Sequence, residues 1–272
     1  MKNTVIDKSR TGTLVISCED RKGLIAATAG MLADHNVNII DTQQYTDLHA
    51  GMFFQRFRFD AKDLDISRSD FRDILRIKLG RFGVEWKLSF HSDKKQVAIF
   101  VSKFEHCIYD LLLRHRLGEL DCDIALVISN HEKLREVAEQ FSVPFHVFPI
   151  TKATKDEQEQ KEIALLEENK IDLIVLARYM QILSPALTGR YPEQIINIHH
   201  STLPAFVGAK PYHQAYQRGV KHIGATAHYV TSELDQGPII EQEFSRCSHK
   251  DTVDDLIRKG RDIERITPVS YT

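Results

Sequence analysis

Three polar residues in the last third of the chain have the types and spacing needed for attack on a carbonyl-type carbon. Asn197 and His199 lie in the segment Ile195–Leu203, and Asp235 lies in Leu234–Pro238. Residues i and i+2 of a strand point to the same face, so the amide and the imidazole can reach one reacting atom. An amide donates to a developing oxyanion, an imidazole moves a proton, and a carboxylate orients or charges the imidazole. The trio indicates a catalytic site.

A structural interpretation of the same residues stays open, because a lone His near a strand end and an Asp-x-Gly-Pro turn are both common. The wider sequence favours catalysis. The segments Ile195–Phe206, Gly224–Val230 and Glu233–Ile240 resemble the folate-dependent formyltransferase superfamily. In that superfamily the Asn, the first His and the Asp form a catalytic triad, and the resemblance gives these roles to the three residues above.

The composition is that of an ordinary globular protein, with 42% hydrophobic and 27% charged residues among 272. The formal net charge is −2 and Lys and Arg are scattered, so no basic stripe for nucleic acid is expected. No apolar run approaches the ~20 residues that span a bilayer, and the first ten residues lack the apolar core of a secretory signal. The four cysteines are widely spaced and match no zinc pattern, which predicts reduced thiols in a cytoplasmic protein.

The first domain is predicted over residues 11–91, where strands and helices follow the order βαββαβ of a ferredoxin-like fold. A strand over 13–18 precedes a helix whose apolar positions include Leu24 and Ile25. The segment 52–59 alternates between apolar and polar residues, as expected for a half-buried antiparallel strand. This half is expected to serve regulation, assembly, or both.

The segment Asp20–Ile25, with Asn36–Ile39 after the helix, resembles an ACT domain. ACT domains commonly bind an amino acid near the first strand–helix loop, often at a dimer interface. The resemblance therefore implies an amino-acid effector site with Asp20, Gly23 and Asn38, and a homo-oligomer. Glycine lets the backbone approach a ligand, and a helix N-terminus favours a carboxylate. The alternative is that Asp20 only caps the helix and Gly23 only permits the turn.

The second domain is predicted over residues 96–272, where strands alternate with helices as in a doubly wound, mostly parallel sheet. The continuous apolar run over 171–177 is typical of a parallel strand, and 156–169 predicts a charged surface helix. In such sheets the site lies at the carboxyl ends of the strands, and both Arg178–Leu183 and Asn197–Ser201 follow strands.

The folate pocket is predicted from the same resemblance. In the superfamily, the segment matching Ala177–Leu183 lines the pterin pocket largely through backbone groups, and the loop matching Val230–Gly237 closes the other wall. The residues expected to bind the substrate are Arg178, Tyr179, Met180, Ile182, Leu183, His200, Ser201 and Gly237. Aliphatic side chains suit a flat heterocycle, although Met180 and Ile182 can equally belong to the core.

Further motifs separate the branches of the superfamily. The stretch Val101–Leu112 has no glycine to bring backbone N–H groups onto a phosphate, and Glu105 would oppose one. A phosphorylated amine is therefore a poor substrate candidate. Lys-x-x-His-Cys at 103–107, the second imidazole at His200 and the motif Phe206–Ala215 together resemble the formyltetrahydrofolate deformylase family, which carries an ACT domain on a formyltransferase-like domain.

This resemblance implies hydrolysis of 10-formyltetrahydrofolate to formate and tetrahydrofolate, which balances folate pools and supplies formate for purine synthesis. Two other functions stay open: formyl transfer to an unidentified amine, and regulatory binding without catalysis. No metal or other cofactor is expected, because amide and imidazole donors can activate the formyl carbonyl. Pro268 is expected to break the last helix earlier than in other members of the family.

Overall fold

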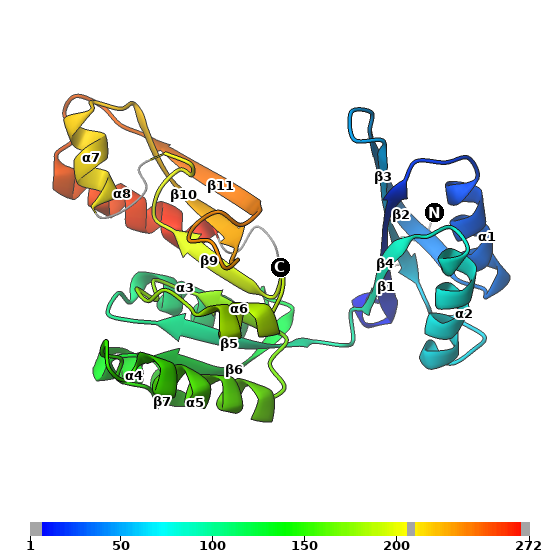
Figure 1. Cartoon of the computed structure of the whole chain (residues 1–272), viewed down its shortest axis with the longest axis horizontal. Helices are drawn as coiled ribbons and strands as arrows, with labels where there is room; N and C mark the ends of the chain where they lie inside the picture. Colours follow the sequence, from blue (N-terminus) through cyan, green and yellow to red (C-terminus); the bar gives the residue numbers. More distant parts are fainter. Residues whose placement is uncertain (1–6, 206–209, 268–272) are drawn as a thin grey trace. The chain divides into compact units, whose positions relative to one another are not determined.

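The computed structural model describes residues 7–205 and 210–267. Phe206–Ala209, part of one motif above, and Pro268 lie outside the described residues. The chain divides into two compact units between Lys94 and Lys95 (Figure 1). Among the described residues, no helix has the length and apolar character that a membrane crossing requires.

The N-terminal unit has the predicted order βαββαβ after a short 3-10 turn, η1. Its elements are η1 (Lys8–Arg10), β1 (Thr11–Glu19), α1 (Leu24–Asp34), β2 (Asn38–Asp47), β3 (Met52–Asp60), α2 (Arg68–Gly80) and β4 (Glu85–Phe90). The strands form an antiparallel sheet in the order β2-β3-β1-β4. Both helices lie on one face of this sheet (Figure 1), which confirms the ferredoxin-like arrangement.

The burial of side chains explains these elements and corrects one position. Alternate residues of β3 are buried, as the sequence predicts for a strand with one face on the core. The assignment of Ile25 to the apolar stripe of α1 is wrong, because this side chain is 44% exposed. The buried stripe instead runs through Leu24, Thr28 and Leu32, and a step of one residue turns Ile25 away from it.

The C-terminal unit alternates strands and helices. Its elements are β5 (Lys95–Val101), α3 (His106–Arg116), β6 (Cys122–Ser129), η2 (Glu132–Leu134), α4 (Arg135–Gln140), β7 (Phe145–Val147), α5 (Lys155–Glu168), β8 (Leu173–Leu176), α6 (Pro185–Arg190), β9 (Ile195–His199), α7 (Pro211–Gln217), β10 (His222–Tyr229), β11 (Ile239–Arg246) and α8 (Val253–Ile266). The described strands form one sheet in the order β11-β10-β9-β8-β5-β6-β7. Strands β5 to β9 pair in parallel, while β10 and β11 are antiparallel.

Both faces of this sheet are covered by helices. In β5, Val97, Ile99 and Val101 belong to the core with α3 and α4, while Ala98 and Phe100 belong to the core with α5 and α6. This arrangement confirms the doubly wound, mostly parallel fold. The order of strands reverses between β5 and β8, and the crevice at the carboxyl ends of strands beside such a reversal is where ligands bind in open α/β sheets.

Helix α5 differs from the charged surface helix expected from the sequence. Glu159 and Glu162 are buried, and both accept hydrogen bonds. An oxygen of Glu159 accepts from the backbone N–H of Ser184 at 2.8 Å, and one of Glu162 accepts from the Tyr179 hydroxyl at 3.0 Å. A buried carboxylate needs such donors. The helix therefore supports the segment that follows β8.

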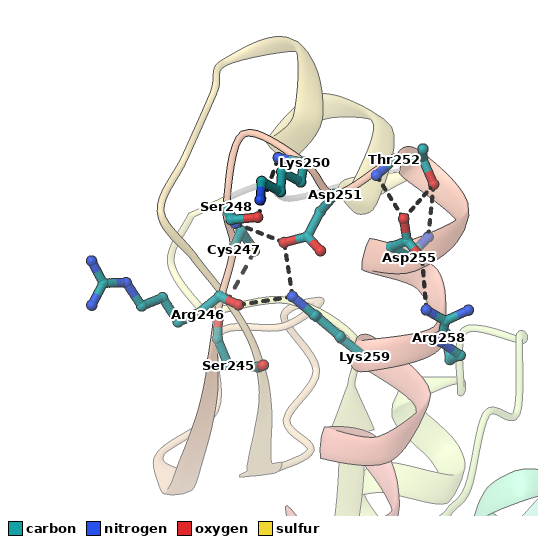
Figure 2. A network of polar contacts seen from close by, with 10 residues as sticks. All are labelled: Ser245, Arg246, Cys247, Ser248, Lys250, Asp251, Thr252, Asp255, Arg258 and Lys259. Carbon is teal, nitrogen blue, oxygen red and sulfur yellow. Dashed lines mark hydrogen bonds and ion pairs between the residues drawn. The ribbon is translucent and has the colours of Figure 1, made fainter.

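The start of α8 is held by polar contacts with the turn that follows β11 (Figure 2). Thr252 and Asp255 form a capping box, in which each side chain accepts from the backbone N–H of the other. One turn further, Lys259 donates to Asp251 at 2.8 Å. Further along α8, Glu264 faces the interior and is 1% exposed.

Candidate active site

The predicted triad meets at the end of β9. Asn197 and His199 occupy positions i and i+2 of this strand, and His228 of β10 stands opposite Asn197 in the antiparallel pair. Asp235 comes from the turn between β10 and β11, where its φ of 56° is left-handed. An Asp tolerates this conformation better than most residues do. Two neighbouring strands and one turn therefore present an amide, two imidazoles and a carboxylate.

These four residues line one cavity with a volume of 260 Å³. Residues 178–183, after β8, form one wall, and residues 230–235 contribute another. Met180, Ile182 and Leu234 line the cavity and are each more than half exposed, which is unusual for large apolar side chains. Apolar walls beside a few convergent polar groups are typical of a site for a small organic molecule.

The polar groups contact one another. A carboxylate oxygen of Asp235 lies 3.5 Å from Nδ1 of His199 and 3.7 Å from Nε2 of His228. Nδ1 of His228 lies 2.9 Å from the carbonyl oxygen of Tyr229, which can only accept, so this nitrogen carries the proton. Nε2 of His228 then accepts from the Asn197 amide at 3.2 Å. Because an amide nitrogen has two N–H groups, Asn197 keeps one donor for a ligand.

Burial determines the charge of His199 and His200, which are adjacent in the chain. It lowers the pKa of His199, and the carboxylate of Asp235 acts in the opposite direction. Burial also lowers the pKa of His200 to about 3, and the charge of Arg178 adds to this effect. Both rings are consequently neutral near pH 7. A neutral imidazole beside a carboxylate can orient it through one N–H.

The structure brings together most, but not all, of the expected substrate-binding residues. The cavity lining includes Arg178, Tyr179, Met180, Ile182, Leu183 and His200, but not Ser201 or Gly237. The Ser201 hydroxyl donates instead to the carbonyl oxygen of Ala205 at 2.5 Å. A Cβ on Gly237 would overlap the carbonyl oxygen of Tyr229, so this glycine serves a close backbone approach.

The cavity wall formed by residues 178–183 is supported by hydrogen bonds and ring packing of Tyr179 and Met180. The Tyr179 hydroxyl points to Glu162, and its ring packs edge-on against Phe100 with centroids 5.1 Å apart. The backbone N–H of Met180 donates to Ser102 at 3.2 Å, and the Ser102 hydroxyl donates to Asn130 at 2.7 Å. The side chain of Tyr179 is thus part of the support for this wall.

The N-terminal unit has a second cavity, of 360 Å³, at the loop between β1 and α1. Asp20 and Gly23 line it, together with Gln44 and Thr46 of β2, whereas Asn38 is not part of the lining. Gly23 has a φ of 92° and is the N-cap of α1, and no side chain caps this helix. The alternative role of Asp20 as a helix cap is therefore wrong.

One group of side chains in the C-terminal unit has potential metal-ligand atoms close together. Atoms of His106, Cys107 and Glu264 lie within 4.8 Å of one another. The carboxylate of Glu264 is already engaged, by the hydroxyl of Tyr212, by His106 and by the guanidinium of Arg178. Burial raises the pKa of Cys107 far above its usual value, which opposes thiolate formation. These contacts disfavour a cation here, and the expectation of a metal-free reaction stays a prediction.

Sequence reasoning missed two residues of this region. His228 lies inside a motif recognised above but received no role, although a polar residue in an otherwise buried strand is an informative signal. Glu264 lies in the charged run Arg261–Arg265, where nothing distinguishes it from its surface neighbours. Only the packing of α8 makes it a buried carboxylate.

Comparisons with known proteins agree with this architecture. Residues 12–75 match the ACT domain and residues 95–271 match the formyl transferase family. A formyltetrahydrofolate deformylase from Synechocystis is 48% identical over 94% of this chain and 90% of its own length. One from Bacillus subtilis is 47% identical over 93% of this chain and 85% of its own length.

A solved structure gives the same result in three dimensions. The crystal structure of a formyltetrahydrofolate deformylase from Pseudomonas syringae superposes with a TM-score of 0.93 at 44% identity, covering 97% of this chain and 88% of the other. The similarity therefore extends over both units of this chain. This chain, with its ACT domain followed by a formyl transferase domain, belongs to the formyltetrahydrofolate deformylase family.

Proposed function

We propose that this protein hydrolyses 10-formyltetrahydrofolate to formate and tetrahydrofolate. The observation that carries the proposal is the convergence of Asn197, His199 and Asp235 in the lining of one cavity with apolar walls. The names of the similar proteins from Synechocystis and Pseudomonas syringae support the same activity. The apolar walls suit a pterin ring, and the polar end suits the formyl group.

The first step is the attack of water on the formyl carbon. Asp235 accepts a proton from the water as the new C–O bond forms. The developing oxyanion is stabilised by the N–H of Asn197 that His228 leaves unused. Nδ1 of His199 faces the Asp235 carboxylate at 3.5 Å and orients it for this proton transfer. Burial lowers the pKa of His199 and keeps its ring neutral before the attack.

The second step is the collapse of the tetrahedral intermediate. The C–N10 bond breaks, its electron pair stays on N10, and N10 takes the proton that Asp235 received. The formic acid released then loses its acidic proton to solvent. The products are formate, tetrahydrofolate and one proton, and the side chains return to their starting states.

The test of this proposal is formate release from 10-formyltetrahydrofolate without any amine acceptor, measured for the wild type and for Asp235→Asn. The proposal predicts turnover in the wild type and a loss of about 10²–10⁴-fold in the variant. Release that requires an added amine would favour formyl transfer. Folate binding without any release would favour a regulatory protein.

We also propose that the cavity of the ACT domain binds an amino-acid effector. A Cβ at Gly23 would meet open space at the α1 N-terminus, which favours a carboxylate. Gln44 of β2 adds a polar side chain to the same lining. Glycine and methionine are the first ligands to test, by calorimetric titration and by their effect on formate release. Gln44→Ala should weaken binding, whereas Asn38→Ala, outside the cavity lining, is the matched control.

A homo-oligomer is proposed from the open face of the N-terminal sheet. Val15, Tyr45 and Phe54 lie on the face away from the two helices, and all three are exposed. Exposed apolar groups gathered on one sheet face are a typical protein contact surface. The cytoplasm is the proposed compartment, supported by four buried free cysteines, and formate for purine synthesis is the proposed physiological product.

A further inference from the structure

Glu264 is a buried carboxylate that the hydrolysis above does not use. It projects from α8 and contacts three other parts of the domain. One carboxylate oxygen accepts from the hydroxyl of Tyr212, of α7, at 2.5 Å. The other lies 2.7 Å from Nε2 of His106, at the start of α3, and 3.4 Å from Nη1 of Arg178, after β8. Burial opposes the ionised form, but these contacts outweigh it and hold the pKa of Glu264 below its usual value.

Arg178 depends on this carboxylate. Its side chain is 9% exposed, and its Nε and Nη1 atoms have no hydrogen-bond partner among the described residues. The guanidinium is held by the ion pair with Glu264 and by the ring of Phe104, whose centroid is 4.6 Å away. Its φ of 63° is unfavourable for a long side chain and persists only when surrounding contacts impose it. Removing the charge of Glu264 leaves a buried cation without compensation.

The same cluster borders the catalytic residues. Arg178 is the first residue of the wall 178–183 that lines the cavity. On the other side, the ring of Tyr212 lies 6.2 Å from the ring of His200, which in turn lies 5.4 Å from the ring of His199. Glu264 therefore contacts both the start of one cavity wall and the aromatic residue that packs behind the histidines.

The packing of α8 fixes Tyr212 in this place. A Cβ on Gly260 would overlap the Tyr212 ring, so the ring lies directly on the helix backbone, one turn before Glu264. Such contact between a ring and a glycine backbone leaves the hydroxyl little freedom. Helix α8 therefore carries the Glu264 carboxylate and also holds the Tyr212 ring of α7 in a fixed position beside it.

We infer that the Glu264–Arg178 ion pair holds the cavity wall and the two histidines in their reactive arrangement, and that both are positioning residues for formyl hydrolysis. The inference rests on the proposed function. Helix α8, which carries no member of the triad, thereby acts on the reaction through the residues that it positions.

The charges of the pair act on the catalytic imidazole in opposite directions. The cation of Arg178 lowers the pKa of His199, and the carboxylate of Glu264 raises it, although burial remains the main cause of the low value. Glu264→Gln should therefore move the His199 titration to lower pH, and Arg178→Gln should move it to higher pH. In the double variant the two effects offset each other.

The experiment compares these three variants with the wild type, using formate release over a range of pH and NMR titration of the His199 ring. Glu264→Gln is expected to lower kcat by roughly 10–100-fold through misplacement of the reacting groups. KM for the folate should change less than kcat, because the apolar side chains that line the cavity are still present although one wall loses a support. The acid limb of the kcat/KM profile should follow the opposite pKa shifts of the single variants and return toward the wild-type position in the double variant.

The control is Asp262→Asn, which removes an exposed carboxylate from the same helix and should leave kcat and the titration unchanged. Normal turnover in Glu264→Gln, or lost turnover with an unshifted His199 titration in both single variants, overturns the inference. If Glu264→Gln does not fold, Tyr212→Phe decides, with an expected loss of roughly 3–10-fold in kcat. A wild type that releases no formate contradicts the proposed function, while the NMR titration still decides whether the pair acts on His199.

Discussion

At the scale of single residues, Asn197 is the donor whose removal most directly tests the oxyanion site. One N–H of its amide is used by His228, and the other remains for the substrate. Loss of one such donor typically removes about 2.7–4 kcal/mol of transition-state stabilisation, so Asn197→Ala should lower kcat for formate release by roughly 10²–10³-fold. Folate binding, measured by titration, should be retained. Near-normal turnover would remove Asn197 from the catalytic site.

The pH dependence also belongs to this scale. Asp235 raises the pKa of His199 against the larger effect of burial, so Asp235→Asn should lower that pKa further. If the neutral ring is the active form, residual activity in the variant should persist to lower pH than in the wild type. The measurement is kcat/KM from about pH 5 to 9. An acid limb that moves to higher pH would contradict the neutral-histidine mechanism.

At the scale of elements, the buried Glu162 of α5 should make the stability of its domain depend on pH, with stability falling as the pH rises. Burial raises the pKa of Glu162 to about 7, above its value in the unfolded chain. The favourable contribution of the protonated group is therefore complete below about pH 4.5 and is lost as the pH rises through 7. Glu162→Gln should remove this loss and gain up to about 3 kcal/mol at pH 8. Calorimetric melting temperatures of variant and wild type should diverge with rising pH, and parallel curves would contradict the assignment.

A second prediction at this scale concerns Gly237, in the turn between β10 and β11. A Cβ on Gly237 would overlap the carbonyl oxygen of Tyr229, so Gly237→Ala must displace the turn that carries Asp235. Such a displacement should lower kcat/KM by about 10–100-fold. Gly189→Ala is the matched control, because a Cβ there meets nothing within 4 Å on a helix. Equal activity of both variants would show that the turn tolerates the shift.

At the scale of the whole molecule, the open face of the N-terminal sheet predicts self-association. Phe54 stands opposite Tyr45 on that face, and both are exposed. Light scattering should give the wild type a mass that is a multiple of 31.2 kDa, and Phe54→Glu should shift it toward a single chain. Ile77→Glu is the matched control, because it adds the same single negative charge at an exposed apolar position of α2, which covers the other face of the sheet. A wild type of single-chain mass would contradict the proposal.

Much of this architecture follows from local sequence patterns. The alternation in β3, the stripe of α1 and the strand–helix order of the second unit are periodic over neighbouring residues, so each can be recognised without knowledge of its partners. The Asn-x-His spacing is local too, because a strand fixes the relation of i to i+2 whatever sheet it joins. For the same reason the sequence failed at Ile25, since the edge of a buried stripe depends on what packs against it.

The sequence by itself determined the two folds and the presence of the three chemical groups on their elements. Only the tertiary structure decided that His228 faces Asn197, that Ser201 turns to Ala205, and that Glu264 lies beside Arg178. These relations join residues of different elements, through the pairing of β9 with β10 and the packing of α8. A charged residue on a helix has the same local signature whether it is solvated or buried. Its role is therefore set by whether folding brings donors to it.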